Sequence, residues 1–180
     1  MSGVTARAWG ADAELLIELD SPGGGGFAVQ GLAGATRASV SIVAPGAPST
    51  SARRLRLRPL VEPPGPFDAD GLLLITPFRE THPDRTALRE FERRIGRAYY
   101  DFMLGARHRY AASCSIEAEG LDAPGTCAEV YRIDAATVAE ADALDEGHEP
   151  PDDILAIYRE CSTFIVPGSH GRFWLIPDPV

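Results

Sequence analysis

The clearest pattern of hydrophobic and polar positions lies in the last two-thirds of the chain. Residues 71–79 form a short apolar run between polar turns, which predicts a buried strand. From 84 to 104 the apolar residues recur at spacings of three and four, so an amphipathic helix is expected there. Gly105 suits the end of this helix. Its polar face is expected to carry Arg89, Glu92, Arg93 and Arg97.

Beyond this helix the apolar residues alternate with a period of two. Residues 110–118 and 126–133 therefore predict two strands of a hairpin. Short helices are expected around 138–144 and over 152–165, followed by a last strand over 172–176. The order strand, helix, strand, strand, helix, strand predicts an α+β fold of the ferredoxin-like type, an antiparallel sheet with helices on one face.

The first 66 residues show a less regular pattern. Residues 13–19 are compatible with one face of a helix, while 38–43 and 53–61 alternate as two strands do. Residues 32–37, before the first of these strands, resemble residues 103–108, before the strand at 110–118. We therefore expect an N-terminal extension or degenerate half repeat over residues 1–66 and a ferredoxin-like α/β-barrel unit over residues 67–180.

Composition excludes several classes of function. All 17 basic residues are arginine, and the absence of lysine is typical of a GC-rich bacterial genome. Without lysine the chain has no Schiff-base nucleophile and no phosphate-loop lysine. The net charge is −9, and residues 111–180 carry 14 acidic residues against 3 arginines. Such a surface repels phosphate backbones, so we expect no nucleic-acid partner.

The chain also lacks the signals of export and of membranes. No stretch approaches the roughly 20 uninterrupted apolar residues of a membrane span, and the N-terminus has no apolar segment behind its charge. We therefore expect a cytoplasmic protein without a membrane partner. Cys114, Cys127 and Cys161 are odd in number and lack close pairing, which predicts reduced, buried thiols.

These elements resemble the dimeric α/β-barrel superfamily, which includes antibiotic-biosynthesis monooxygenases, EthD-like proteins and small polyketide cyclases. The resemblance covers about residues 70–176. It is carried by the strand at 71–79, by Leu104-Gly105-Ala106 directly before a strand, and by Glu129-Val130-Tyr131-Arg132-Ile133-Asp134 before an alanine-rich helix.

The resemblance implies a small homodimeric enzyme of bacterial secondary metabolism that needs no cofactor. Its acid–base chemistry, of the cyclase, isomerase or monooxygenase type, would act on an aromatic or polyketide-like metabolite. A non-catalytic binding or assembly subunit on the same fold is the alternative. Haem or flavin binding, found in some relatives, stays open.

Candidate catalytic residues follow from strand periodicity. Glu129 and Tyr131 share one face of a predicted strand, and His108 and His170 flank strands that can neighbour them. We expect at least one histidine near Tyr131, with histidine as general base and tyrosine as proton donor or orienting group. The alternative is a solvated sheet face on which Tyr131 only packs.

Aromatic residues of the predicted helices and last strand suggest a pocket for a flat apolar ligand. Small residues on the facing strands leave room for one. Equally, aromatic residues opposite small ones can simply fill a core. The acidic loop at 145–153 lacks the spacing of a calcium or zinc site, so no metal is expected. The candidate ligand-binding residues are Phe91, Tyr99, Phe102, Tyr158 and Trp174.

Overall fold

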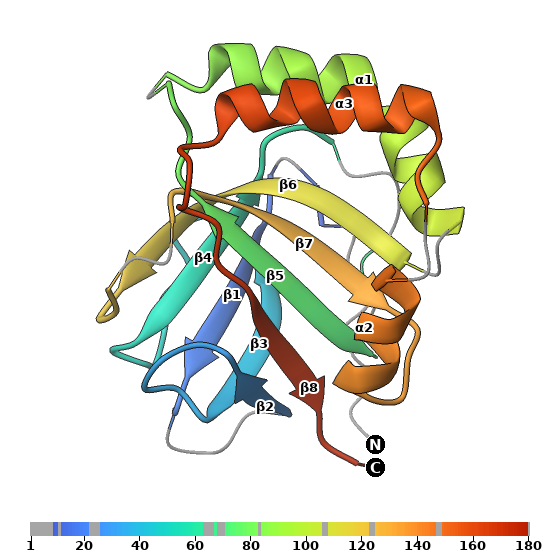
Figure 1. The fold of residues 1–180 in the computed structure, drawn as a ribbon. Helices are drawn as coiled ribbons and strands as arrows, with labels where there is room; N and C mark the ends of the chain where they lie inside the picture. The colour runs from blue at the N-terminus through green and yellow to red at the C-terminus, as the bar shows by residue number, and fades with distance from the viewer. Residues whose placement is uncertain are drawn as a thin grey trace.

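The protein folds into a closed, antiparallel barrel of eight strands (Figure 1). Around the barrel the strands follow the order β1-β3-β2-β8-β5-β7-β6-β4, and β4 pairs with β1 to complete the ring. The computed structural model describes residues 9–10, 12–21, 26–62, 67, 71–82, 84–105, 108–122, 125–146 and 149–179.

The strands divide equally between residues 1–66 and 67–180, called the first and the second half below. The first half supplies β1 (Glu14–Leu19), β2 (Phe27–Gln30), β3 (Arg37–Val43) and β4 (Arg54–Pro59). The second half supplies β5 (Leu72–Phe78), β6 (His108–Glu119), β7 (Cys127–Ile133) and β8 (Phe173–Pro177). Each half contributes strands in the corresponding order, β4-β1-β3-β2 and β8-β5-β7-β6.

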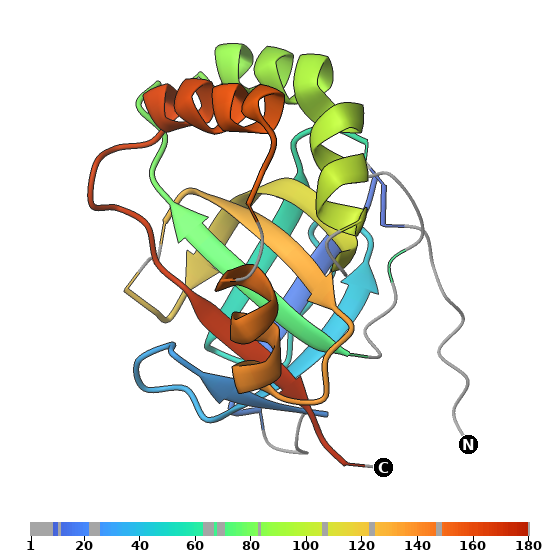
Figure 2. The same ribbon diagram turned by 45° about the vertical axis from the view of Figure 1, so that its right-hand side comes forward.

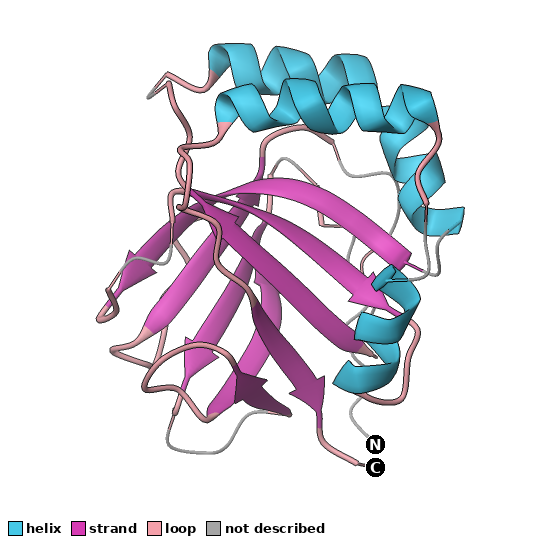
Figure 3. Ribbon diagram, viewed as in Figure 1, coloured by secondary structure: helices cyan, strands magenta, loops and turns pink. Residues whose placement is uncertain are grey.

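Helices lie outside the barrel (Figure 3) and, in the described residues, belong to the second half only. They are α1 (Thr86–Gly105), α2 (Val138–Glu146) and α3 (Asp152–Cys161), and a 3-10 turn, η1 (Ser162–Phe164), follows α3. Figures 1 and 2 show α1 and α3 side by side above one side of the barrel, and α2 against its flank. Both α1 and α3 lie where the sequence predicts helices.

The predicted fold class is wrong: the chain does not form a ferredoxin-like α+β sheet of the dimeric α/β-barrel type with helices on one face. The four strands expected in that sheet are present as β5 to β8, but neither edge of the group is open. Val29 of β2 pairs with Leu175 of β8, and Leu57 of β4 pairs with Ile116 of β6. Closure satisfies the backbone groups that two edge strands would otherwise expose.

The helix considered for residues 13–19 is also wrong, because this segment is β1. Leu15, Ile17 and Leu19 are fully buried inside the barrel, and Leu16 is buried on its outer face. A strand that is buried on both faces reads as a continuous apolar run, and periodicity does not distinguish such a run from a buried helix.

Side chains fill the interior of the barrel. Alternate residues of neighbouring strands point inward and form one apolar cluster. At one end the ring of Phe67 meets Trp9 edge to face, with their centroids 5.4 Å apart. The fully buried members include Leu15, Ile17, Leu55, Leu57, Leu73, Ile75, Phe173 and Leu175.

A second apolar cluster joins the helices to the outer face of the barrel. Leu88, Phe91, Ile95 and Tyr99 follow one face of α1 at helical spacing, and all four are buried. They pack with outward-facing residues of β5, β7 and β8, among them Leu72, Leu74, Tyr131, Ile133 and Trp174. Since side chains fill the barrel interior, we expect a ligand to bind between the helices and the barrel.

A buried ion cluster anchors the start of β1. The carboxylate of Glu14, only 3% exposed, accepts hydrogen bonds from Arg56 at 2.9 Å, Arg58 at 2.5 Å and the amide of Gly46 at 3.2 Å. Burial raises the pKa of Glu14, but the bonds from Arg58 and Arg56 outweigh it and hold this pKa below 4.5. The cluster ties β1 to β4 and to the turn after β3.

Replacing Glu14 with alanine is expected to destabilise the protein by about 3 kcal/mol at pH 7, because the largely buried Arg56 loses its partner. Since folding lowers this pKa, the contribution of Glu14 is present above pH 4.5 and is lost as the pH falls through the folded-state value. Urea unfolding at pH 7 and pH 3 measures both effects. If the wild type and Glu14→Ala had the same free energy of unfolding at pH 7, the ion cluster would not contribute to stability.

Candidate functional site

A cavity of about 540 Å³ lies outside the barrel, between α1, α3 and the segment that leads from α3 to β8. The floor is formed by Glu129, whose side chain projects from the outer face of β7. Most of the wall is apolar or aromatic. These lining residues are Phe91, Ile95, Tyr99, Ile157, Tyr158, Ile165, Val166 and Pro167.

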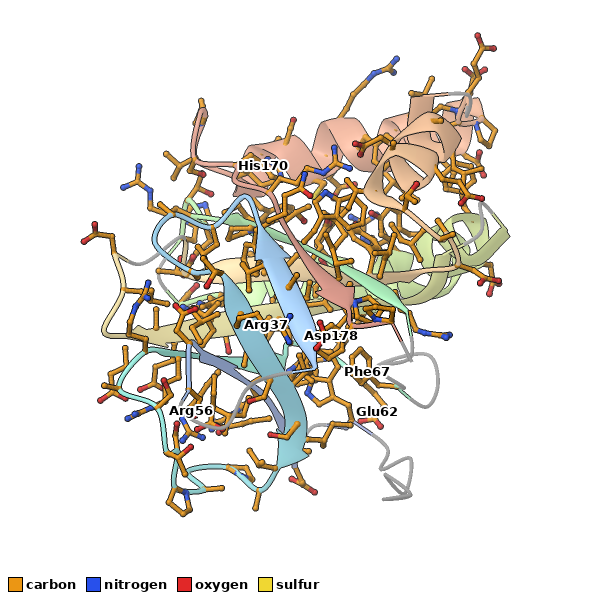
Figure 4. All side chains as sticks on the ribbon, turned by 90° about the horizontal axis from the view of Figure 1, so that it is seen from below. Arg37, Arg56, Glu62, Phe67, His170 and Asp178 are labelled. Carbon is orange, nitrogen blue, oxygen red and sulfur yellow. The ribbon has the colours of Figure 1, made fainter. Side chains whose placement is uncertain are left out.

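A few polar side chains interrupt this wall. Besides Glu129 they are Glu92 from α1, Cys161 and Ser162 at the end of α3, and His170. Figure 4 places His170 on the segment between α3 and β8. Its side chain is exposed, whereas Glu92 is only 3% exposed. An apolar enclosure with a small number of polar groups is typical of small-molecule sites.

Glu129 belongs to a chain of hydrogen bonds that begins and ends at residues lining the cavity. Tyr131 donates its hydroxyl proton to Oε2 of Glu129 at 2.5 Å, and the hydroxyl oxygens of Tyr131 and Tyr99 lie 2.8 Å apart. Glu129 and Tyr131 are two residues apart on β7 and therefore share its outer face. Thr76 lies opposite Glu129 on β5.

The electrostatic environment shifts the protonation of Glu129. Burial raises the pKa of its carboxyl above 4.5. The hydrogen bond from Tyr131, the charge of His170 and the hydroxyl of Thr76 lower this pKa, but they do not offset the burial. A carboxyl group with a raised pKa at a cavity surface is suited to taking and returning protons.

The thiols are unsuited to nucleophilic chemistry. Burial, followed by the charges of Glu129 and Glu92, raises the pKa of Cys161 to about 12. Burial also raises the pKa of Cys127 to about 12 and that of Cys114 well above its usual range. All three cysteines are free thiols, and reactive cysteines require the thiolate form. The acid–base groups of the cavity are therefore carboxyl, imidazole and phenol.

The structure brings most of the sequence-predicted site residues together. Glu129 and His170 line the cavity with Phe91, Tyr99 and Tyr158, and Tyr131 lies directly behind Glu129. Two other predicted ligand residues are absent from the described lining. Trp174 is buried in the outer cluster, with the guanidinium of Arg172 5.0 Å from its ring, and Phe102 is half-buried on α1. His108 begins β6, and its side chain lies outside what the structure describes.

Sequence reasoning missed Glu92, which was assigned to the polar face of α1. In the structure Glu92 is buried and lines the cavity. Its position was available from spacing, because Leu88, Glu92, Ile95 and Tyr99 follow steps of four, three and four along one helix face. Ile157 and Ile165 were also missed as lining residues, because their contact with the cavity depends on how α3 packs.

Replacing Glu129 with glutamine is expected to stabilise the protein at pH 8. Folding raises this pKa, so the cost of ionising the half-buried carboxyl grows as the pH rises through 4.5 and is full above the folded-state value. Glutamine removes the cost and can still accept the Tyr131 hydrogen bond. We expect a gain of about 1 kcal/mol, or about 2–4 °C in melting temperature.

Thermal unfolding of both proteins between pH 4 and pH 8 measures this effect, and the difference should vanish toward pH 4. Glu117→Gln serves as the control, because Glu117 is an exposed glutamate of β6. This control should change the free energy of unfolding by no more than about 0.5 kcal/mol. A glutamine variant at 129 that is less stable than the wild type at pH 8 would contradict the assignment of the raised pKa.

Comparison with family models, curated proteins and solved structures returned no match for this chain. Within the described part of the chain, no group of three or more histidine, cysteine, aspartate and glutamate residues is arranged to hold a metal ion. None of the described helices has the length and apolar character to cross a membrane.

Proposed function

We propose that the protein is a small-molecule enzyme that moves protons on an apolar, aromatic or polyketide-like metabolite, with Glu129 as the proton-accepting group. The single observation that carries this proposal is the position of Glu129. Its hydrogen-bonded carboxyl group, with a raised pKa, lines an otherwise largely apolar cavity. Catalytic carboxyl groups require such a combination of access and tuned proton affinity.

The form of the cavity supports this class of substrate. Its volume of about 540 Å³ suits a small organic molecule. The rings of Phe91, Tyr99 and Tyr158 offer surfaces on which a flat apolar body can pack. The homodimer implied by the family resemblance stays a prediction.

The proposed reaction is a proton transfer without net oxidation. Glu129, as the carboxylate, takes a proton from an acidic C–H next to a carbonyl of the substrate, and the released electron pair moves into that carbonyl to give an enolate or phenolate. The newly protonated Glu129 then returns the proton at another atom, which restores its carboxylate. If His170 gives this second proton instead, Glu129 releases its own proton to solvent and His170 regains one from solvent. This sequence supports isomerisation or cyclisation. It needs no lysine, no thiolate and no cofactor.

The proposal is tested by incubating the protein in D2O with a bacterial metabolite extract and following deuterium uptake by mass spectrometry. At least one apolar metabolite is expected to gain deuterium with the wild type and with Glu117→Gln, but not with Glu129→Gln. If a metabolite co-purifies with the protein and exchanges no hydrogen, the chain is instead a non-catalytic binding subunit.

A further inference from the structure

Two buried tyrosines are linked by hydrogen bonds to Glu129, the proton-accepting group of the cavity. Tyr131 is 5% exposed and Tyr99 is 7% exposed, and they come from β7 and α1. Their hydroxyl oxygens are 2.8 Å apart, and that of Tyr131 is 2.5 Å from Oε2 of Glu129. Two side chains of β7 and one of α1 thus form one continuous chain of hydrogen bonds.

The direction of this chain follows from counting protons. An ionised carboxylate only accepts hydrogen bonds, so the single hydroxyl proton of Tyr131 points to Glu129. The oxygen of Tyr131 then accepts from Tyr99, which must donate. Burial, followed by the charge of Glu129, raises the pKa of each phenol well above 10, so both tyrosines keep their protons.

We propose that Tyr131 and Tyr99 are positioning residues, whose ordered hydrogen bonds hold Oε2 of Glu129 and leave Oε1 as the oxygen that exchanges protons with the ligand. This inference rests on the proposed function. The bond to a charged acceptor is stronger than one between neutral groups, and a second donor in the chain strengthens it further. In this chain of hydrogen bonds, Tyr131 links Tyr99 to Glu129.

Other groups around Glu129 influence its pKa without taking part in this chain of hydrogen bonds. His170 acts on Glu129 through its charge and Thr76 through its hydroxyl, and both lower the pKa of Glu129. Removing a tyrosine hydroxyl leaves these influences in place. The remaining titratable groups on the same cavity wall are Glu92, Tyr158 and Cys161.

The inference predicts a graded change in proton affinity. Because the Tyr131 bond favours the ionised form, Tyr131→Phe is expected to raise the pKa of Glu129 by about one pH unit, a tenfold change. Tyr99→Phe should raise this pKa by a smaller amount. Ser162→Ala is the matched control, because it removes from the same cavity a hydroxyl that donates to the carbonyl of Arg159 and not to the chain. It should leave the pKa of Glu129 unchanged.

The test is an NMR titration of the full chain labelled with ¹³C at the glutamate carboxyl carbon. The resonance of Glu129 is assigned by its loss in Glu129→Gln. The expected order of pKa values is Tyr131→Phe above Tyr99→Phe, with both above the wild type and Ser162→Ala. An unchanged value in Tyr131→Phe, or a rise in Tyr99→Phe at least as large as in Tyr131→Phe, would overturn the inference.

If Tyr131→Phe does not fold, Tyr99→Phe alone tests the inference. A rise in the pKa of Glu129 in this variant supports the chain of hydrogen bonds, and an unchanged pKa refutes it. The titration uses the protein without ligand, so its result does not depend on turnover. If the proposed function is wrong and this inference is right, no metabolite takes up deuterium, but the pKa of Glu129 still rises in the two tyrosine variants. If this inference is wrong, the pKa of Glu129 is the same in the wild type and in both tyrosine variants.

Discussion

Replacing Glu129 with glutamine should lower the rate of deuterium uptake by about 10²- to 10⁴-fold, the usual contribution of a positioned acid–base group. Glutamine has nearly the same shape and can still accept the hydrogen bond from Tyr131, so binding of the metabolite should be retained. The variant therefore separates proton transfer from recognition. A loss of turnover with unchanged affinity is the signature of an interaction needed in the transition state.

The pH dependence of turnover provides a second readout of the same residue. Because Glu129 accepts the proton as the carboxylate, the wild-type rate should rise with pH as this group ionises, with a midpoint above 4.5. Initial rates of deuterium uptake between pH 4 and pH 9 give this midpoint. Glu117→Gln should follow the wild-type curve. If the rate of Glu129→Gln still rose with pH at the same midpoint as that of the wild type, the base would be another residue.

Replacing Ile75 with alanine should destabilise the protein by about 3 kcal/mol without loss of ligand binding. Ile75 is fully buried among the side chains that fill the barrel, and it does not line the functional cavity. A chain of this length should lose about 6–12 °C in melting temperature. Thermal unfolding and metabolite binding are measured on the same preparation.

Ile42→Ala provides the comparison for this substitution, because Ile42 is only partly buried against the same cluster. Its loss should be about 1 kcal/mol, since less apolar surface is removed from contact. If Ile75→Ala abolished binding while the protein remained folded, the ligand would lie inside the barrel rather than beneath the helices.

Local periodicity was sufficient to place most elements of the second half. The alternation of apolar residues predicted β6 and β7, and the three-and-four spacing predicted α1. Local patterns say nothing, however, about which strands meet at the edges of a sheet. Closure depends on pairing between distant segments, such as β2 with β8 and β4 with β6, so the open sheet was the wrong prediction.

The candidate site was predictable where it depends on a single strand. A period of two puts Glu129 and Tyr131 on one face of β7, and the structure shows their hydrogen bond. The meeting of Tyr99 with Tyr131 depends on how α1 crosses the barrel, and no local pattern encodes this crossing. For the same reason aromatic character alone did not separate Tyr158, in the cavity wall, from Trp174, in the packed cluster.

A crystal structure of Glu129→Gln with the exchanging metabolite bound tests the role of Glu129 most directly. We expect the metabolite to occupy the cavity between α1, α3 and β7. Its exchanging atom should lie within about 3.5 Å of the position of Oε1 of Glu129, the distance at which a proton passes directly. A metabolite bound elsewhere, or bound in this cavity with its exchanging atom beyond reach of residue 129, would contradict the claim.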